Sequence, residues 1–221
     1  MTDHESGRGR RPHGRGSLGT RAPLIGLIGP IGCGKSTVAG WLADRGAAVI
    51  DADRLTRDLM APGRPVTESI VARFGERYRR PDGSLDRAAV GRLVFSDPDR
   101  LAELEAIVHP AVERLEMDAI HAADAARPTA IVLEAIKLVE AGHAPWCDEI
   151  WLVRCDPKAQ LARLTGRGMA ESDAHQRIAA QVGSLPAWRA AATHTIRTDG
   201  SPEEVALAVN AALEELLARR R

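Results

Sequence analysis

The feature that most constrains this chain is a glycine-rich segment, GPIGCGKS, at residues 29–36. It matches the pattern G-x-x-x-x-G-K-[ST], follows a short apolar run at 24–29, and precedes residues 35–45, whose apolar side chains have helical spacing. Glycines let the backbone curl so that successive N–H groups point inward, and the N-terminus of the next helix adds partial positive charge. The segment therefore predicts a cradle for nucleotide phosphates, placed between a strand and a helix.

The polar residues of this cradle have predicted roles in binding a nucleoside triphosphate. Lys35 would reach the β- and γ-phosphates, the Ser36 hydroxyl would bind Mg²⁺, and Thr37 would contact the α-phosphate. ATP and Mg²⁺ are therefore the expected cofactors. The residues expected to bind ATP here are Gly29, Ile31, Gly32, Cys33, Gly34, Lys35, Ser36 and Thr37. The motif alone does not separate kinases from GTPases, transporters or helicases.

Short apolar runs alternate with helical segments along the chain, which predicts an α/β fold with a parallel sheet. Strands are expected at 24–29, 47–53, 129–135, 149–155 and 194–200; helices are expected at 35–45, 54–60, 65–76, 86–95, 98–124, from 157 to 164, at 171–182 and at 202–217. The long helical excursion between the second and third strands, about 60–125, suggests an insertion that binds the acceptor. No internal repeat or second independent domain is evident, so 23–221 is expected to be one domain.

Residues 1–22 are rich in Gly, Arg and Pro and have no hydrophobic period, which predicts a disordered basic tail. Nucleic-acid binding by this tail is an alternative to a simple solvated extension. The whole chain has 30 basic and 30 acidic residues, so its net charge indicates neither a nucleic-acid nor an acidic-membrane partner. The sequence leaves open a monomer or a weak homo-oligomer.

The remaining composition points to a soluble cytoplasmic enzyme. No stretch approaches the roughly 18 apolar residues of a membrane span, and no apolar segment follows the basic N-terminal run, as a secretory signal would require. The three cysteines, at 33, 147 and 155, have no metal-ligand or redox spacing, and an odd number of such thiols fits a reducing compartment. Cys33 is interpreted as a small residue inside the phosphate loop, with a redox role as the alternative.

Two carboxylates follow the second predicted strand, in Asp51-Ala52-Asp53. Residues i and i+2 of a strand face the same way, so both side chains would project beside the cradle, where open α/β sheets bind ligands. We assign Asp53 to the attacking hydroxyl, which it would orient and deprotonate, and Asp51 to the metal's water shell or to positioning. The alternative for Asp51 is to cap the following helix.

Two arginines, Arg163 and Arg167, lie four residues apart in a helical segment and so share one face. Guanidinium groups that close over the γ-phosphate would neutralise the charge of the transition state, and closure would exclude water. We therefore predict a helical lid at about 158–182, with Arg163 catalytic and both arginines in contact with ATP. A solvated basic face is the alternative in this Arg-rich chain.

Several motifs, taken in order, resemble those of dephospho-CoA kinases. They are the stretch 29–59, Pro62-Gly63, 82–86, Val94-Phe95, 107–110, 161–164 with Arg167, Arg177-Ile178, Gln181, and 199–201. The similarity covers about residues 24 to 217. It implies a three-layer P-loop kinase fold with a helical CoA-binding insertion and a mobile lid. It also implies transfer of the ATP γ-phosphoryl group to the ribose 3′-hydroxyl of dephospho-CoA, giving CoA and ADP.

The resemblance also implies residue roles on the acceptor side. Asp53 matches the family's proposed base, and His109 falls on the acceptor-site motif, although a lone histidine in a helical region also fits a packing role. With Lys137 and Glu140, these residues form the predicted substrate site. Glu134 keeps an acid at the end of the third strand, where it would reach the metal through water.

The chain departs from the family pattern at two places. Ile136 and Lys137 stand where the family usually has Pro and Leu, and Lys137 would pair with Glu134 or Glu140 or meet a substrate phosphate. Thr198 replaces an Asn that usually precedes Asp-Gly, which leaves adenine recognition near 198–200 open.

Two other functions remain as alternatives. Another small-molecule kinase would act on a nucleoside, a nucleotide or a shikimate-like alcohol, and the helical insertion with His109-Pro110 argues against it. A nucleotide-binding regulatory module would lack turnover, and the set of Lys35, Ser36, Asp53 and Arg163 argues against that.

Overall fold

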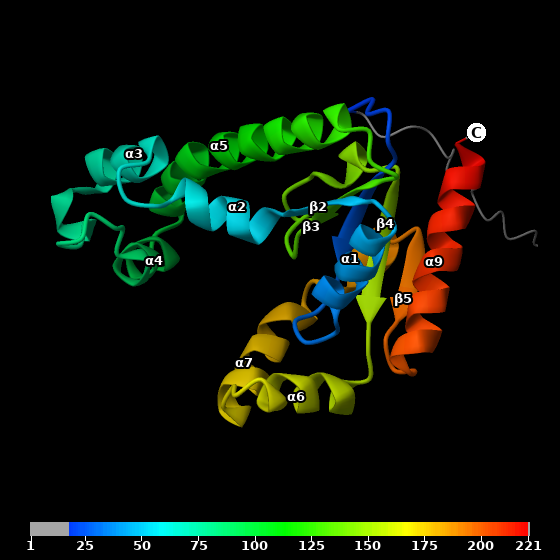
Figure 1. Cartoon of the computed structure of the whole chain (residues 1–221). Helices are drawn as coiled ribbons and strands as arrows, with labels where there is room; N and C mark the ends of the chain where they lie inside the picture. Colours follow the sequence, from blue (N-terminus) through cyan, green and yellow to red (C-terminus); the bar gives the residue numbers. More distant parts are fainter. Residues whose placement is uncertain (1–17, 221) are drawn as a thin grey trace, which may run out of the picture.

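Five short strands form a parallel sheet in the computed structural model of the chain, which describes residues 18–220 (Figure 1). The strands are β1 (Leu24–Ile28), β2 (Ala48–Asp51), β3 (Ile131–Glu134), β4 (Glu149–Arg154) and β5 (His194–Arg197). Their order is β2-β3-β1-β4-β5, so β1 lies in the middle with β3 and β4 beside it. All pairs are parallel, which brings the carboxyl ends of the strands to one edge of the sheet.

Helices cover both faces of this sheet, which gives three layers. The helices α1 (Lys35–Asp44) and α9 (Pro202–Arg219) pack on one face, where Leu27 of β1 points. The end of α5 (Pro98–Ala125) and α8 (Leu185–Ala191) pack on the other face, where Ile28 points. This alternation along β1 explains its continuous apolar sequence, because a strand covered on both faces has no side chain in water.

The helical insertion has a core of its own. It consists of α2 (Ala52–Leu59), α3 (Pro65–Phe74), η1 (Glu76–Tyr78), α4 (Arg87–Phe95) and the first part of α5. Its buried residues are Val66, Ile70, Val71, Phe74, Tyr78, Leu85, Val90 and Val94. The 28-residue helix α5 runs from this core back to the sheet, where Ile120 is fully buried (Figure 1). One long helix therefore holds the insertion beside the sheet.

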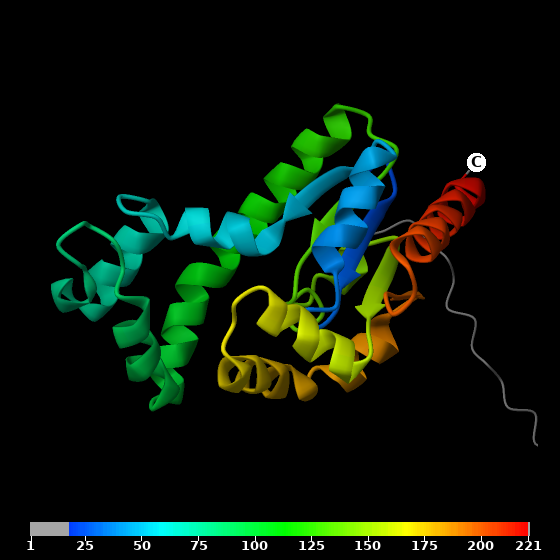
Figure 2. The same ribbon diagram turned by 60° about the horizontal axis from the view of Figure 1, so that its bottom comes forward.

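Two helices follow β4 at the carboxyl edge of the sheet, α6 (Pro157–Gly166) and α7 (Glu171–Val182), and they form the region predicted as the lid (Figure 2). The described chain also contains three elements that the sequence did not predict, η1, η2 (Ala144–Trp146) and α8. All three are shorter than eight residues, too short for a hydrophobic period to be recognised.

Several predicted boundaries differ from the structure, and two of these differences have a clear physical cause. The second strand ends at Asp51 instead of residue 53, because the Asp51 side chain accepts a hydrogen bond from the N–H of Arg54 and caps α2. The tail, predicted to be disordered to residue 22, lies outside the described residues up to 17, but Thr20 and Ala22 are buried. Asp124, at the end of α5, accepts hydrogen bonds from the N–H groups of Arg21 and Ala22 at 3.1 and 2.9 Å.

Candidate active site

The phosphate loop lies between β1 and α1, as predicted, and its backbone depends on glycine. Gly29 has φ +144°, and a Cβ atom there would lie 2.2 Å from the backbone oxygen of Val153 on the neighbouring strand. No side chain fits that position. The buried Lys35 turns back into the loop and donates a hydrogen bond from Nζ to the Gly29 carbonyl at 2.9 Å. The loop thus curls around its own lysine.

Lys35 lies among three carboxylates whose attraction partly offsets the effect of its burial. Burial lowers the pKa of Lys35, while Glu134 at the end of β3, then Asp53 and Asp51, raise it. The Ser36 hydroxyl donates a hydrogen bond to Glu134 Oε1 at 3.2 Å. Burial raises the pKa of Glu134, and Lys35 opposes that rise. One cation, one hydroxyl and three carboxylates therefore share the carboxyl edge of the sheet.

Asp53 reaches this edge by a different route from the one predicted. It lies in the first turn of α2 and not on β2, so the alternation of side chains along a strand does not place it. Partial burial raises the pKa of Asp53, and repulsion from Asp51 raises it further. Asp51 has the capping role that the sequence left as its alternative. A carboxylate with a raised pKa is the kind of group that can take a proton near neutral pH.

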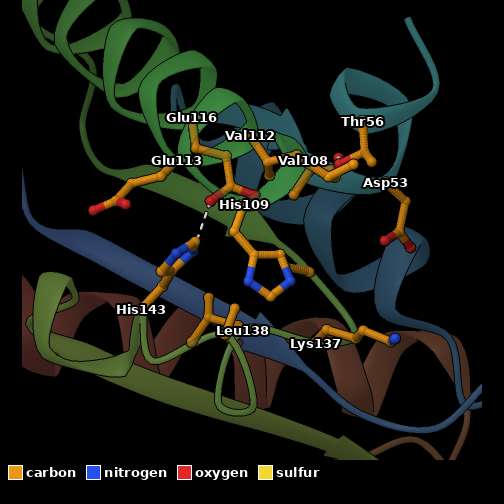
Figure 3. A pocket seen from close by; sticks show the side chains of 13 residues that line it. Asp53, Thr56, Val108, His109, Val112, Glu113, Glu116, Lys137, Leu138 and His143 are labelled. Carbon is orange, nitrogen blue, oxygen red and sulfur yellow. Dashed lines mark hydrogen bonds and ion pairs between the residues drawn. The ribbon is translucent and has the colours of Figure 1, made fainter. Parts of the chain in front are cut away.

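Asp53 lines a cavity of about 480 Å³ enclosed by α2, α5 and the segment that follows β3. Figure 3 shows Asp53, His109 of α5 and Lys137 around this cavity. Lys137 is the only Lys or Arg among the residues that line it. Within residues 18–220, no carboxylate forms an ion pair with Lys137, so neither pairing that the sequence suggested for it occurs.

The structure does not bring Glu140 to the cavity. Its carboxylate accepts hydrogen bonds from Trp188 Nε1, at 3.0 and 3.2 Å to the two oxygens, and so ties the segment after β3 to α8. Two residues that the sequence analysis missed do line the cavity, Glu116 and His143, with His143 Nδ1 2.8 Å from Glu116 Oε2 (Figure 3). Glu116 follows His109 by seven residues on one helix, a spacing that would have predicted a shared face.

A second cavity, of about 260 Å³, is lined in part by the phosphate loop. Its lining includes Gly34 of the loop, Thr37 of α1, Arg163 of α6 and Arg167, which follows α6, so both arginines lie beside the loop. Arg163 donates hydrogen bonds to the side chain and backbone oxygens of Thr198, the first at 2.9 Å. Residues 198 to 205 complete this wall, which places the segment that departs from the family pattern directly beside the loop.

Cys33 and Cys155 form a disulfide, and their Cα atoms are 5.2 Å apart. The interpretation of the cysteines as unpaired thiols is therefore wrong for this pair. The sequence gave no spacing signal because the two residues are 122 positions apart, and they meet only because β1 and β4 are neighbours in the sheet. Cys147 is free and buried, and burial raises its pKa to about 12.

Ser36 and Glu134 are the residues best placed to approach a metal ion. Among residues 18–220, no three His, Cys, Asp or Glu side chains gather as a metal-binding group. One hydroxyl with a carboxylate beside it fits Mg²⁺, which keeps several waters and takes its other ligands from nucleotide phosphates. In the same described part of the chain, no helix is long and apolar enough to cross a membrane.

An acceptor held at Asp53 would face a nucleotide phosphate at Lys35 across the carboxyl edge of the sheet. This arrangement, on a parallel α/β sheet with a lid, defines the class of P-loop kinases. The family model for dephospho-CoA kinase matches residues 23–204. The chain belongs to the dephospho-CoA kinase family.

Individual relatives agree with this assignment. The chain is 46% identical over 190 residues to a protein of Symbiobacterium thermophilum named dephospho-CoA kinase, a match that spans 86% of this chain and 79% of that one. It is 43% identical over 195 residues to a protein of Moorella thermoacetica with the same name, spanning 87% and 92%. A crystal structure of a Thermus thermophilus protein superimposes with a TM-score of 0.72 at 35% identity, covering 88% of this chain and 98% of that one.

Proposed function

We propose that this protein transfers the γ-phosphoryl group of ATP to the ribose 3′-hydroxyl of dephospho-CoA, giving CoA and ADP in the last step of coenzyme A biosynthesis. The observation that carries the proposal is the cavity shared by Asp53, His109 and Lys137, whose Asp53 interacts electrostatically with the buried Lys35 of the phosphate loop. Family membership supports the choice of acceptor. A nucleotide-binding module without turnover would have no need for a carboxylate with a raised pKa in a cavity next to its phosphate loop.

Asp53 is the proposed general base. The acceptor's 3′-hydroxyl would donate to the Asp53 carboxylate, its oxygen would attack the γ-phosphorus, and the bond to the β-phosphate oxygen would break to release ADP. The hydroxyl proton passes to Asp53 as the new bond forms. The charged surroundings support this role, because Asp51 raises the pKa of Asp53 toward the working range while Lys35 and Arg57 keep it from rising further.

The ATP side is proposed to act through charge and position. Lys35 would bind the β- and γ-phosphates, and the Ser36 hydroxyl would bind Mg²⁺, with Glu134 and Asp51 reaching the metal through water. Mg²⁺ held there would neutralise part of the phosphate charge. Arg163 now donates to Thr198, close to the loop, and on closure of α6 and α7 would turn to the γ-phosphate. Arg167, on the same cavity wall, would assist.

Lys137 is the residue proposed to recognise the charged part of the acceptor. Dephospho-CoA carries a diphosphate, and Lys137 is the one cation in a cavity lining that also contains Asp53, Glu113 and Glu116. Lys137 and His109 also line a third, largely apolar cavity, which lies in the insertion. The two cavities together would accommodate a long acceptor better than a compact alcohol.

We also propose roles for the insertion and the lid, a location in the cell and an oligomeric state. The insertion of about 60–125 would bind the acceptor, residues 158–182 would act as the lid, and the enzyme would work in the cytoplasm as a monomer or weak homo-oligomer. Light scattering of the purified protein and fractionation of cells would test the last two points.

The direct test is purified protein with Mg-ATP and dephospho-CoA, with products identified by mass. We expect CoA and ADP in equal amounts and no CoA when Mg²⁺ is removed with a chelator. Shikimate, adenosine and a nucleoside monophosphate serve as alternative acceptors at the same concentration. Folded protein that binds ATP but forms no CoA would overturn the proposal, and preferred turnover of another acceptor would identify a different small-molecule kinase.

A further inference from the structure

The Cys33–Cys155 disulfide joins the phosphate loop to the start of the lid. Cys33 lies in the loop between β1 and α1, and Cys155 follows β4. The next residue, Asp156, caps α6 by accepting a hydrogen bond from the N–H of Lys158 at 2.8 Å. We propose that Cys33 and Cys155 form an exchange site for small thiols and disulfides, and that the state of this bond sets how readily the lid closes over ATP.

The disulfide and the nucleotide would occupy opposite sides of the loop. The Cys33 side chain is 1% exposed and belongs to the core cluster between the sheet and the helices α1 and α9. The loop would bind phosphates through its backbone N–H groups and Lys35, which do not involve this sulfur. ATP can therefore bind whether the bond is formed or broken.

Reduction would leave the shape of the loop in place, because other contacts hold it. The Cys33 carbonyl accepts a hydrogen bond from Thr198 Oγ1 at 2.8 Å. The Ile31 carbonyl accepts from Gln160 Nε2 at 2.7 Å, and the Ile31 N–H donates to Gln181 Oε1 at 2.8 Å. Gln160 and Gln181 belong to α6 and α7, so the loop is also bound to the lid by contacts that can break during closure.

A covalent bond at the start of α6 cannot break in that way. Arg163 lies on α6 and would have to leave Thr198 to reach a phosphate, a change that movement of α6 relative to the loop would allow. The disulfide fixes residue 155, one position before the cap of this helix, to residue 33 of the loop. The oxidised protein should therefore close more slowly than the reduced protein while it binds ATP equally well.

The exchange needs two equivalents of a small thiol. Cys155 is only partly buried, so a thiolate would attack its sulfur; the Cys33–Cys155 bond breaks, and Cys33 leaves as a thiolate and takes up a proton. A second thiolate attacks the outer sulfur of the mixed disulfide, which releases Cys155 and a small-molecule disulfide. Two electrons pass from the two thiols to the protein, and their two protons end on the two cysteines. Reaction with a small disulfide runs the same steps backward.

The test begins with a count of thiols that does not depend on catalysis. The full-length protein is incubated with reduced or oxidised glutathione, unfolded in denaturant so that buried thiols can react, alkylated, and analysed by mass. We expect three alkylated cysteines after reduction and one after oxidation, since Cys147 forms no disulfide within the described residues and the chain has three cysteines in all. Three alkylated cysteines under both conditions would overturn the exchange site.

The effect on the lid is then measured with dephospho-CoA whose thiol is methylated, so that the acceptor cannot reduce the protein. This readout rests on the proposed function, whereas the thiol count does not, so the two can fail separately. We expect kcat to be about three- to tenfold lower in the oxidised form, with the Kd for ATP changed less than about twofold. Equal kcat values would make the bond purely structural, and a large change in Kd would place its effect on the loop instead of the lid; both results overturn the proposal.

Two variants complete the design. Cys155→Ala cannot form the bond and leaves the phosphate loop unchanged in sequence, so its kcat should equal that of the reduced protein under both conditions. Cys147→Ala is the matched control, because it removes a buried thiol outside the pair, and it should keep the full response. A response that survives Cys155→Ala, or disappears in Cys147→Ala, would contradict the assignment to Cys33 and Cys155.

Discussion

The two cavities beside the phosphate loop are built in different ways. The ATP side uses a continuous run of nine residues, 29–37, and much of its binding capacity comes from backbone N–H groups held by glycines. The acceptor side uses side chains from α2, α5 and the segment after β3, such as Asp53, His109 and Lys137. A backbone site changes little when side chains vary, whereas a side-chain site can be retuned by single substitutions. The two sides should therefore respond differently to mutation.

The largest effect is expected from the residue that serves both sides. Lys35→Ala should reduce kcat by about 10³-fold or more, because it removes the cation that would meet the transferred phosphate. It also removes the positive charge of Lys35 from the neighbourhood of Glu134, Asp53 and Asp51. Steady-state kinetics provides the measurement, and circular dichroism checks that the fold is kept. A loss below tenfold would mean that backbone groups alone are enough to bind and stabilise the phosphates.

The next effect isolates the acceptor side. Asp53→Asn should lower kcat by about 10²- to 10⁴-fold, since the amide cannot take the hydroxyl proton. The Kd for ATP should stay within a small factor. Because the pKa of Asp53 is raised by folding, the ionised carboxylate costs stability, and that cost is fully present above the folded-state pKa. Thermal unfolding at pH 7 should therefore show an unchanged or higher midpoint for Asp53→Asn. Nearly normal turnover would move the base to another residue.

The lid arginine tests whether closure matters more than binding. Arg163→Ala should lower kcat by about 10- to 100-fold and change the KM for ATP much less, because its present partners are Thr198 oxygens and its phosphate contact would form on closure. Arg163→Lys should recover part of the rate. If KM rises while kcat is kept, Arg163 contacts ATP already in the ground state.

Lys137 gives a smaller and more selective effect. Lys137→Leu should raise the KM for dephospho-CoA by about tenfold, roughly 1.4 kcal/mol, with little change for ATP. Lys158→Met is the matched control, since Lys158 is exposed and lines neither cavity. Adenosine, which has no diphosphate, should react equally with both variants if it reacts at all. An equally large rise in KM for adenosine would show that Lys137 does not bind the diphosphate.

The smallest expected effect is a shift in the pH dependence of kcat. The proposed base must be ionised, so kcat should fall as the pH drops through the raised pKa of Asp53. Asp51→Asn removes a negative charge that raises this pKa, while Asn still caps a helix well. The acid limb of the pH–rate profile should therefore move to lower pH, by less than about one unit. A shift to higher pH, or no shift, would show that Asp51 does not raise the pKa of the base.

The sequence predictions were more accurate for the phosphate loop than for the acceptor side. The phosphate loop and Lys35 were predicted because each requirement, from strand to glycine to helix, is contained in neighbouring residues. Asp53 was placed in the right region for a wrong reason, since a helical turn positions it after Asp51 ends the strand. Glu140 was assigned to the acceptor, but Trp188, 48 residues away, binds its carboxylate. Nothing local to Glu140 indicates that partner.

The sequence by itself determined the α/β fold, the order of its elements and the phosphate loop, because these depend on short-range periodicity and on glycine's freedom at positive φ. Only the tertiary structure decided which distant residues meet. It paired Cys33 with Cys155 across β1 and β4, set His143 against Glu116, and left Lys137 facing a cavity without an ion-pair partner in the described chain. The physical reason is that such contacts depend on the order of the strands and the path of α5, which no local pattern of residues encodes.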